Sequence, residues 1–259
     1  MPNDFSHPSQ LGLTSSETIE TLLQRRSIRK YNDTPVTDDQ VDAILKAAFR
    51  APTSSNIQSY TVITVRNPET KQRLAVPTGN QQHIIDCPVF LAFCADLTRL
   101  EHVLKERNHT LGNNNLEIGL VSSIDASLVG MSAYLAAESL GIKGVMIGAV
   151  RNDAVKIAEI LELPKFVFCV FGMCLGYPAE IPQQKPRMKQ DFVVHREKFQ
   201  PEKVAASVEA YDPALRAHYE KIGKKTTPDS WSHDMDKKFH PQLREGLRAQ
   251  LKKQGFDFR

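Results

Sequence analysis

The sequence predicts a fold of the α+β class, with a mixed α/β sandwich as the alternative. Short apolar runs rich in β-branched and aromatic residues recur along the chain, which is typical of strands. The segments between these runs carry apolar residues at the helical period. One long stretch, residues 117–141, is small or apolar on all sides. Strands that alternate with helices around a buried helix indicate a sheet covered by helices.

The stretch EIGLVSSIDASLVGMSAYLAAESLG is predicted to be a central helix. Its only charged residues are Glu117, Asp125 and Glu138, whereas a surface helix has one charged face. We therefore expect burial on most sides, with small residues that allow close packing against other helices or a symmetry mate. The carboxylates and serines argue against a membrane span, although the length would suffice.

The end of the central helix leads into a possible ligand site. Gly141 is a C-terminal cap signal, and the apolar run GVMIGAV (144–150) follows. Asn152 or Asp153 would then cap the next helix. A buried helix, a strand, a glycine turn and a new helix together could frame a ligand.

The other elements follow from caps and periodicity. They are a helix from Thr14, Ser15 or Ser16 through Leu23, a helix capped by Thr37 (38–51), a strand over 60–66, a helix at 71–75, a strand over 88–96, a helix over 153–163, a strand over 166–178 and a terminal helix near 242–253. Residues 98–116 are polar, and the sequence leaves open whether they form a mobile lid.

Composition and motif searches exclude several function classes. The chain is 41% hydrophobic and 24% charged with a net charge of +3, too mild to indicate nucleic-acid or membrane binding. The 8 histidines lack metal-site spacing. No GxGxxG follows the first strand, and the chain has no GxxxxGK[ST] and no GxSxG. Dinucleotide folds, P-loops and acyl transfer are therefore not supported.

The cysteines indicate the compartment. The 4 cysteines lie in apolar, strand-like runs and form no CxxC pair: Cys87, Cys94, Cys169 and Cys174. No signal peptide precedes them. Buried, reduced thiols are expected in a cytoplasmic protein.

Two basic pairs are candidate phosphate ligands. In RRSIRK, an extended backbone would project Arg25, Ser27 and Arg29 to one side, because strand side chains alternate. The alternative is a solvated basic helix end. Lys185 and Arg187 flank Pro186, which holds the backbone extended, and the alternative there is a surface loop. The two pairs would suit a phosphate dianion if the fold joined them.

A polar loop, PTSSNIQS (52–59), offers hydroxyl and amide groups to a flat, polar ligand. A helix-capping loop is the alternative. Gln81 and Gln82 give a similar, weaker signal.

Six segments, taken in order, resemble those of flavin-dependent nitroreductases, in particular the NADPH-preferring oxygen-insensitive nitroreductases and NADPH–flavin oxidoreductases. They are RRSIRKYNDTPV, APTSSNIQSYTVI, TGNQQHI, AAESLGIKGVMIGAVRND, LPKFVFCVFGMCLGYPAE and KPR. The resemblance implies an α+β fold with a mixed sheet, an intertwined homodimer and FMN at its interface. It also implies an FMN-binding core over residues 14–195, an extension over 196–259 that wraps the core or the partner, and a flexible leader over 1–13.

The same resemblance implies roles for individual residues. Arg25 and Ser27 would bind the FMN phosphate with Lys185 and Arg187, while Arg29 would lie at the pyrimidine edge. The backbone N–H of Gly148 would donate to flavin N5. The full set of implied cofactor positions is Arg25, Arg26, Ser27, Arg29, Thr53, Ser54, Ser55, Asn56, Ile57, Gln58, Gln81, Met146, Ile147, Gly148, Ala149, Lys185 and Arg187. The loop 53–58 would come from the partner subunit.

Two departures from the family pattern stand out. Position 149 is Ala where a second Gly is common. The coenzyme-side turn reads KIGKKTTPDSW rather than being arginine-rich, so Lys224 and Lys225 would meet the 2′-phosphate of NADPH as point charges. The sequence therefore leaves open whether NADPH or NADH is the co-substrate.

The implied activity is ping-pong hydride transfer from NAD(P)H through FMN to nitroaromatics, quinones, flavins or azo compounds, with no protein acid or base required. The first alternative is a flavin-cleaving or dehalogenating enzyme on the same fold. The second is a non-enzymatic nucleotide- or nucleic-acid-binding protein, which would show salt-dependent nucleic-acid affinity and no flavin absorbance.

Overall fold

The structure is a computed structural model that describes residues 14–112, 115–224, 230–241 and 243–258. The chain forms two compact units, one built from residues 25–182 and 244–259 and the other from 1–24 and 183–243. The predicted leader, residues 1–13, lies outside the described residues. The predicted division into 14–195 and 196–259 rests on family resemblance rather than on compactness, and it stays a prediction.

The larger unit contains a sheet of 4 strands in the order β1-β2-β4-β3. The strands are β1 (Tyr60–Val65), β2 (Val89–Asp96), β3 (Lys143–Ile147) and β4 (Val167–Gly176). The α+β class is confirmed, but the expected mixed sheet needs correction, because every pairing between these described strands is antiparallel. Side-chain patterns of buried strands do not reveal strand direction, so the sequence could not decide this point.

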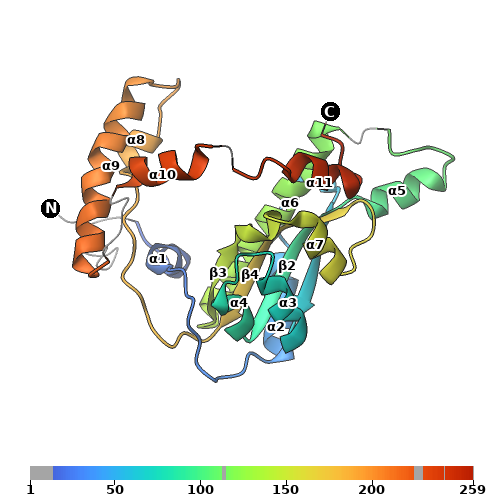
Figure 1. Cartoon of the computed structure of the whole chain (residues 1–259), viewed down its shortest axis with the longest axis horizontal. Helices are drawn as coiled ribbons and strands as arrows, with labels where there is room; N and C mark the ends of the chain where they lie inside the picture. The colour runs from blue at the N-terminus through green and yellow to red at the C-terminus, as the bar shows by residue number, and fades with distance from the viewer. Residues whose placement is uncertain (1–13, 113–114, 225–229, 242, 259) are drawn as a thin grey trace. The chain divides into compact units, whose positions relative to one another are not determined.

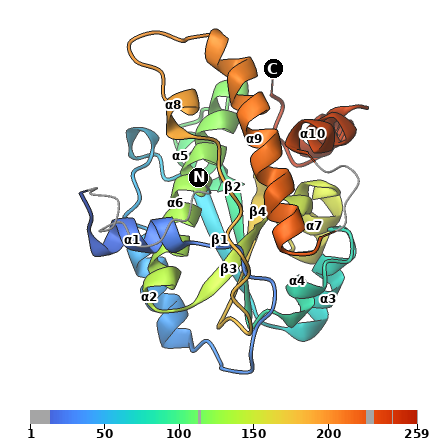
Figure 2. The ribbon, with the colours of Figure 1, turned by 90° about the vertical axis from the view of Figure 1, so that its left-hand side faces the viewer.

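Helices cover both faces of this sheet. The helical elements of the unit are α2 (Asp38–Ala48), η2 (Ser54–Asn56), α3 (Pro68–Ala75), α4 (Gln82–Asp86), α5 (Thr98–Lys105), α6 (Leu116–Ser139), η3 (Gly148–Arg151), α7 (Ala154–Ile160) and α11 (Leu247–Lys253). Figures 1 and 2 both show α3, α4 and α7 on one side of the strands, with α2 and α6 on the other.

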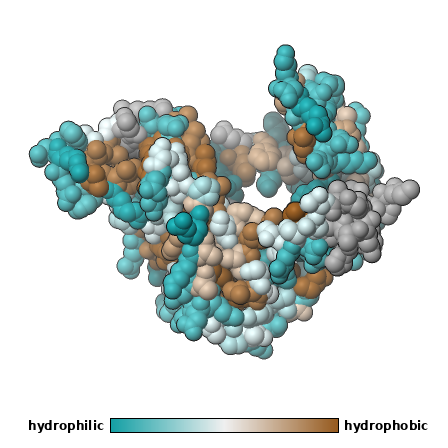
Figure 3. All heavy atoms as spheres, turned by 180° about the vertical axis from the view of Figure 1, so that it is seen from behind, coloured by the Kyte–Doolittle hydropathy of each residue, from teal (hydrophilic) through white to brown (hydrophobic). Residues whose placement is uncertain are grey.

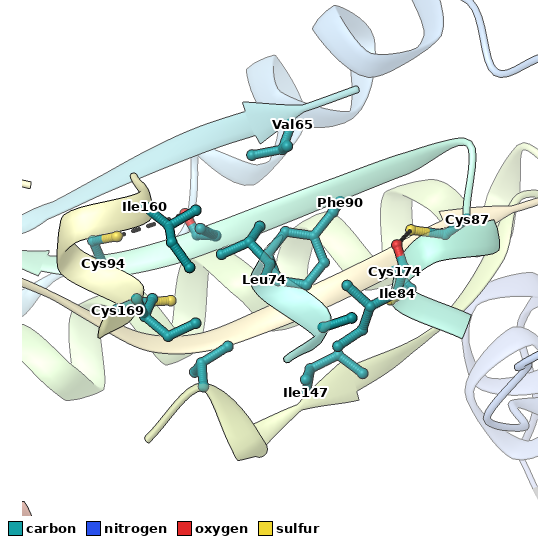
Figure 4. Close-up of a cluster of buried hydrophobic side chains, with 14 of the residues drawn as sticks. Val65, Leu74, Ile84, Cys87, Phe90, Cys94, Ile147, Ile160, Cys169 and Cys174 are labelled. Carbon is teal, nitrogen blue, oxygen red and sulfur yellow. Dashed lines mark hydrogen bonds between the residues drawn. The ribbon is translucent and has the colours of Figure 1, made fainter. Parts of the chain in front are cut away.

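Strand β2 explains this layering, because all of its residues are buried and successive side chains point to opposite faces. Leu91 and Phe93 pack in the cluster formed with α2 and α6. Phe90 and Ala92 pack in the cluster formed with α3, α4 and α7, where Figure 4 shows Phe90 beside Leu74. A continuous apolar run is what a strand buried on both faces requires.

The central helix α6 is confirmed, with Asn115 as N-cap and Gly141 in the left-handed region (φ +74°) after its end. Burial is one-sided within the chain, however. Apolar residues along the opposite side are exposed, namely Leu116, Leu120, Ile124, Leu128 and Met131. Figure 1 shows α6 behind the strands. Figure 3, the same molecule seen from behind, shows hydrophobic surface between hydrophilic residues.

By length and composition alone, α6 is the one described helix that could cross a membrane, and 44% of its most apolar window is buried in the protein. Asp125 and Glu138 on this helix are buried among protein groups rather than directed to solvent. This burial is typical of a core helix.

Several predicted caps and boundaries are confirmed. Thr37 forms a capping box with Gln40 at the start of α2, and the side chain of Asp153 caps α7. The strand predicted over 144–150 ends earlier, at Ile147, because Gly148 begins the short helical turn η3. The terminal helix begins at Leu247, later than the expected residue 242, which lies outside the described residues.

The regular elements among the described residues of the smaller unit are all helices. Its helices are α1 (Glu17–Gln24), α8 (Gln190–Val193), α9 (Glu202–Lys221) and α10 (Trp231–Phe239). Asp212 of α9 accepts hydrogen bonds from the backbone N–H of Ser232 (2.9 Å) and from its hydroxyl, which fixes α10 against α9. The Ser232 hydrogen bonds also hold the pKa of Asp212 below its ordinary value, although partial burial alone would raise that pKa.

Candidate functional site

The basic segment that follows α1 is extended. Residues 25–30 have no helical structure, and the backbone N–H of Ile28 donates to the carbonyl oxygen of Gly144 in β3 (2.9 Å). Ile28 is fully buried, whereas Ser27 is half-buried and Arg29 is exposed. The extended alternative is therefore confirmed over a basic helix end. The alternation places Ser27 and Arg29 on the side opposite Ile28.

Tyr134 of α6 fixes the start of this segment. Its hydroxyl shares its hydrogen between the carbonyl oxygens of Arg26 (2.9 Å) and Gly144 (3.0 Å), and it accepts from Nη1 of Arg25 (3.5 Å). The Arg25 guanidinium also lies over the Tyr134 ring, 5.6 Å from its centroid. Burial raises the pKa of Tyr134, so the hydroxyl keeps the proton that it donates.

Glycine at position 144 is required by protein packing. A Cβ atom there would lie 1.9 Å from the carbonyl oxygen of Cys174 on the neighbouring strand, closer than any real contact. Gly144 thus lets β3 approach β4 while its own carbonyl oxygen accepts from Ile28 and Tyr134. The basic segment is held to β3, the strand that ends at Ile147, directly before Gly148.

Gly148 differs from Gly144, because little in the protein occupies the space beside it. A Cβ atom at this position would meet only the Arg151 side chain, at 3.4 Å. Gly148 and Ala149 are half-buried and Met146 is exposed. The side chain of Ile147 instead points into the core, where Figure 4 shows it near Ile84, so only its backbone is left for a ligand.

Two arginines that no sequence motif marks lie beside Gly148. Arg244 donates from Nη2 to the carbonyl oxygen of Gly148 (3.4 Å) and from Nε to the side chain of Asn152 (2.9 Å). Arg151 donates to the carbonyl oxygen of Val170. Burial, and then the charge of Arg244, lower the pKa of Arg151 from its ordinary value. Two guanidinium groups therefore lie close together at the glycine turn.

His83 in α4 is partly buried near the basic segment's charge. Burial, followed by the positive charge of Arg29, lowers the pKa of His83. The Nε2 atom of His83 is buried and has no hydrogen-bond partner among the described residues. Buried polar atoms are normally paired, so this atom marks a place where a ligand could bind. Gln81, the N-cap of α4, is half-buried and donates to the carbonyl oxygen of Thr78 (2.8 Å).

The polar loop is tied to the central helix. It contains the short turn η2, and its exposed side chains are Ser54, Ser55, Asn56 and Gln58, while Thr53 and Ile57 are half-buried. The carboxylate of Asp125 accepts hydrogen bonds from both ends of this loop. No side chain of the loop caps η2.

In the smaller unit, the segment around Pro186 is extended as predicted. Exposed and half-buried residues alternate along 183–189, with Lys185 and Arg187 both exposed. The carbonyl oxygen of Pro186 accepts from the Tyr211 hydroxyl (2.9 Å), and Lys185 Nζ lies 5.5 Å from the Tyr219 ring centroid. Lys224 lies over the same ring at 4.6 Å, while Lys225 is outside the described residues.

Comparisons with known proteins show which family the chain belongs to. The sequence model of the nitroreductase family matches residues 22–177, and that of the family's C-terminal domain matches residues 185–259. The chain belongs to the nitroreductase family. The predicted resemblance is thereby confirmed.

Similar relatives in this family cover most of the chain. An FMN reductase [NAD(P)H] of Bacillus subtilis is 38% identical over 248 residues, covering 93% of this chain and 98% of that protein. An oxygen-insensitive NADPH nitroreductase of Salmonella typhimurium is 37% identical over 243 residues with the same coverage of 93% and 98%. The solved structure of an NADPH:FMN oxidoreductase from Vibrio harveyi, complexed with NAD+, superposes with a TM-score of 0.85 at 32% identity, covering 94% of this chain and 100% of that chain.

Proposed function

We propose that this family member is an FMN-dependent NAD(P)H oxidoreductase that reduces small aromatic acceptors such as nitroaromatics, quinones, free flavin or azo compounds. The observation that carries the proposal is the joining of the basic segment to the glycine turn through Gly144. A basic segment and an open backbone thereby lie at the two ends of one short strand. The names of the relatives, which include FMN reductases and a nitroreductase, support the same activity.

The residues present fit FMN by the chemistry of their donors. Arg25 and Ser27 supply a guanidinium and a hydroxyl for a phosphate, and Arg29 supplies a cation for the electron-rich pyrimidine edge. The space beside Gly148 allows a flat ring to approach the backbone. The Nε2 atom of His83, which has no hydrogen-bond partner among the described residues, offers a further polar contact.

When bound, FMN supplies hydride acceptance from a reduced nicotinamide and hydride donation to the acceptor. The protein's part is electrostatic and positional. Arg29 would stabilise negative charge at the pyrimidine edge of bound FMN, and the backbone N–H of Gly148 would be available to donate a hydrogen bond to the ring. The assignment of Lys185 and Arg187 to the phosphate continues to rest on the family resemblance.

The arginines beside Gly148 bear on the choice of coenzyme. Guanidinium groups bind phosphates with two parallel hydrogen bonds, which a lysine cannot do. Arg151 and Arg244 are therefore candidates for the anionic groups of the nicotinamide coenzyme, in addition to Lys224 and Lys225. NADH and NADPH share the pyrophosphate that such a pair would bind, so the two arginines leave the choice between these coenzymes open.

We infer a homodimer from the exposed side of α6. Leucine, isoleucine and methionine side chains repeat along it at helical spacing, between 38% and 54% exposed: Leu116, Leu120, Ile124, Leu128 and Met131. An apolar stripe of this length on a single chain marks an interaction surface. A second copy on this surface would also bring its 53–58 loop, which is tied to Asp125 on the same helix, towards the site.

The compartment proposed is the cytoplasm. All 4 cysteines have free thiols and are buried. Free thiols are the usual state in a reducing compartment. We propose small-molecule acceptors and no nucleic-acid or membrane partner.

The test is reconstitution followed by turnover. Protein freed of flavin should bind FMN in one-to-one ratio and turn yellow. It should then oxidise NADPH with a nitrofuran and with a quinone. Failure to bind FMN would contradict the proposal, whereas tight binding with negligible turnover of both acceptors would favour flavin cleavage or dehalogenation.

A further inference from the structure

The carboxylate of Asp125 is fully buried in α6, and its hydrogen bonds lead to the polar loop rather than to solvent. Oδ1 accepts from the backbone N–H of Ser54 (3.0 Å). Oδ2 accepts from the backbone N–H of Ser59 (3.2 Å) and from the Ser59 hydroxyl (3.1 Å). One carboxylate thus anchors both ends of the loop, at Ser54 and at Ser59.

The loop between these two anchors is strained. Ser55, Asn56 and Gln58 have φ values of 48°, 56° and 54°, in the left-handed region. Asparagine tolerates this region, but for serine and glutamine it costs about 1 kcal/mol or more each. Internal support is limited to short-range bonds, such as Ile57 N–H to the Ser54 carbonyl oxygen (2.9 Å). Such a conformation persists only where surrounding contacts impose it.

We propose that Asp125 is a positioning residue for the cofactor site: it holds the loop 53–58 in the conformation that presents its exposed polar side chains to the flavin before the flavin binds. The inference rests on the proposed function. If the anchored conformation is populated only in part, the apparent dissociation constant for FMN rises by the inverse of that fraction.

The two anchors require a carboxylate at position 125 rather than any polar residue. Both oxygens accept, and their partners include two backbone N–H groups that cannot turn away. Asparagine at this position has the same volume but only one acceptor oxygen. Its NH2 group would face either Ser54 N–H or Ser59 N–H, so one end of the loop would be released.

The variant Asp125→Asn is therefore compared with Ser59→Ala. The alanine variant loses one hydrogen bond to the same carboxylate but keeps both backbone bonds, so it controls for a general loss of stability. We measure FMN affinity by fluorescence titration, unfolding by urea, and hydrogen exchange at the Ser54 and Ser59 amides of the FMN-free protein.

Asp125→Asn should weaken FMN binding by about tenfold or more, the effect of one unpaired buried group, and should speed exchange at one of the two amides. Ser59→Ala should leave FMN affinity within about twofold and amide protection unchanged. If Asp125→Asn speeds amide exchange but binds FMN as wild type does, the residue is only structural and the inference is overturned. Unchanged FMN affinity together with unchanged amide exchange would overturn it as well.

Should Asp125→Asn fail to fold, Ser54→Pro against Ser54→Ala carries the test. Both variants lose the hydroxyl, and only the proline variant also loses the N–H that donates to Asp125, at a first helical position that tolerates proline. Weaker FMN binding by the proline variant than by the alanine variant supports the inference, and equal binding overturns it. Failure of the wild-type protein to bind FMN would contradict the proposed function instead.

Discussion

Gly144 and Gly148 stand four positions apart, and alanine at each should have opposite effects on folding and on cofactor binding. At Gly148 a methyl group would meet only the flexible end of Arg151, at 3.4 Å. The backbone there is outside the left-handed region, so alanine adds no strain. The free energy of unfolding of Gly148→Ala should therefore change by no more than about 1 kcal/mol, in either direction.

A methyl group at Gly144 would lie 1.9 Å from the Cys174 carbonyl oxygen, a backbone atom that cannot rotate away. Gly144→Ala should therefore destabilise the FMN-free protein by about 1–3 kcal/mol or more, the usual effect of overpacking. This contrast separates glycines required by packing from a glycine required by a ligand.

For FMN binding, the larger effect is expected from Gly148→Ala. If the ring lies against the Gly148 backbone, a methyl group at that position would hold the ring away and remove the hydrogen bond from its N–H. The dissociation constant for FMN should rise about tenfold or more, equivalent to at least about 1.4 kcal/mol. Urea unfolding of the FMN-free protein and FMN fluorescence titration measure the two effects separately. Wild-type FMN affinity in Gly148→Ala would refute the placement of the ring.

Four further predictions concern single side chains. Arg29→Ala should lower the reduction potential of bound FMN by about 30 mV for each 1.4 kcal/mol of lost interaction, and an unchanged potential at full occupancy would move Arg29 off the ring. Arg187→Ala should speed FMN loss on dialysis relative to wild type; equal loss would remove it from the phosphate. Ile124→Glu should shift the protein to monomer in light scattering, and a dimer that persists would place the interface elsewhere. Burial and the charge of Arg29 lower the pKa of His83 in the folded FMN-free protein, so protonation of His83 is less favourable in the folded state than in the unfolded state. As the pH falls below about 6.5, wild type should therefore lose more stability between pH 7 and 5 than His83→Gln, which has no titrating group at this position. Equal losses of stability in the two proteins would contradict this.

Much of the fold could be read from local patterns. Thr37, Asp153 and Gly141 act through residues a few positions away, so their capping roles were predictable from the sequence. The extended conformation of 25–30 was one of two alternatives, and the burial of Ile28 decides between them. The direction of strand pairing was not predictable, because the side-chain pattern of a buried strand is the same in both directions.

The parts of the site that were missed depend on distant pairs. Arg244 contacts Gly148 across 96 positions, and Asp125 contacts Ser54 across 71. Neither contact leaves a periodic signal. The only available sign for Asp125 was its charge within an otherwise almost uncharged helix, which argues against a membrane span but does not by itself indicate a buried anchor.

The central claim is that one flavin site joins the basic segment to the glycine turn at the end of β3. A crystal structure of the protein reconstituted with FMN tests it most directly. The account predicts density for the ring against the backbone of Gly148, with Arg29 at its pyrimidine edge and Arg25 at the phosphate. Full FMN occupancy with the ring elsewhere, or with the phosphate away from Arg25, would contradict it.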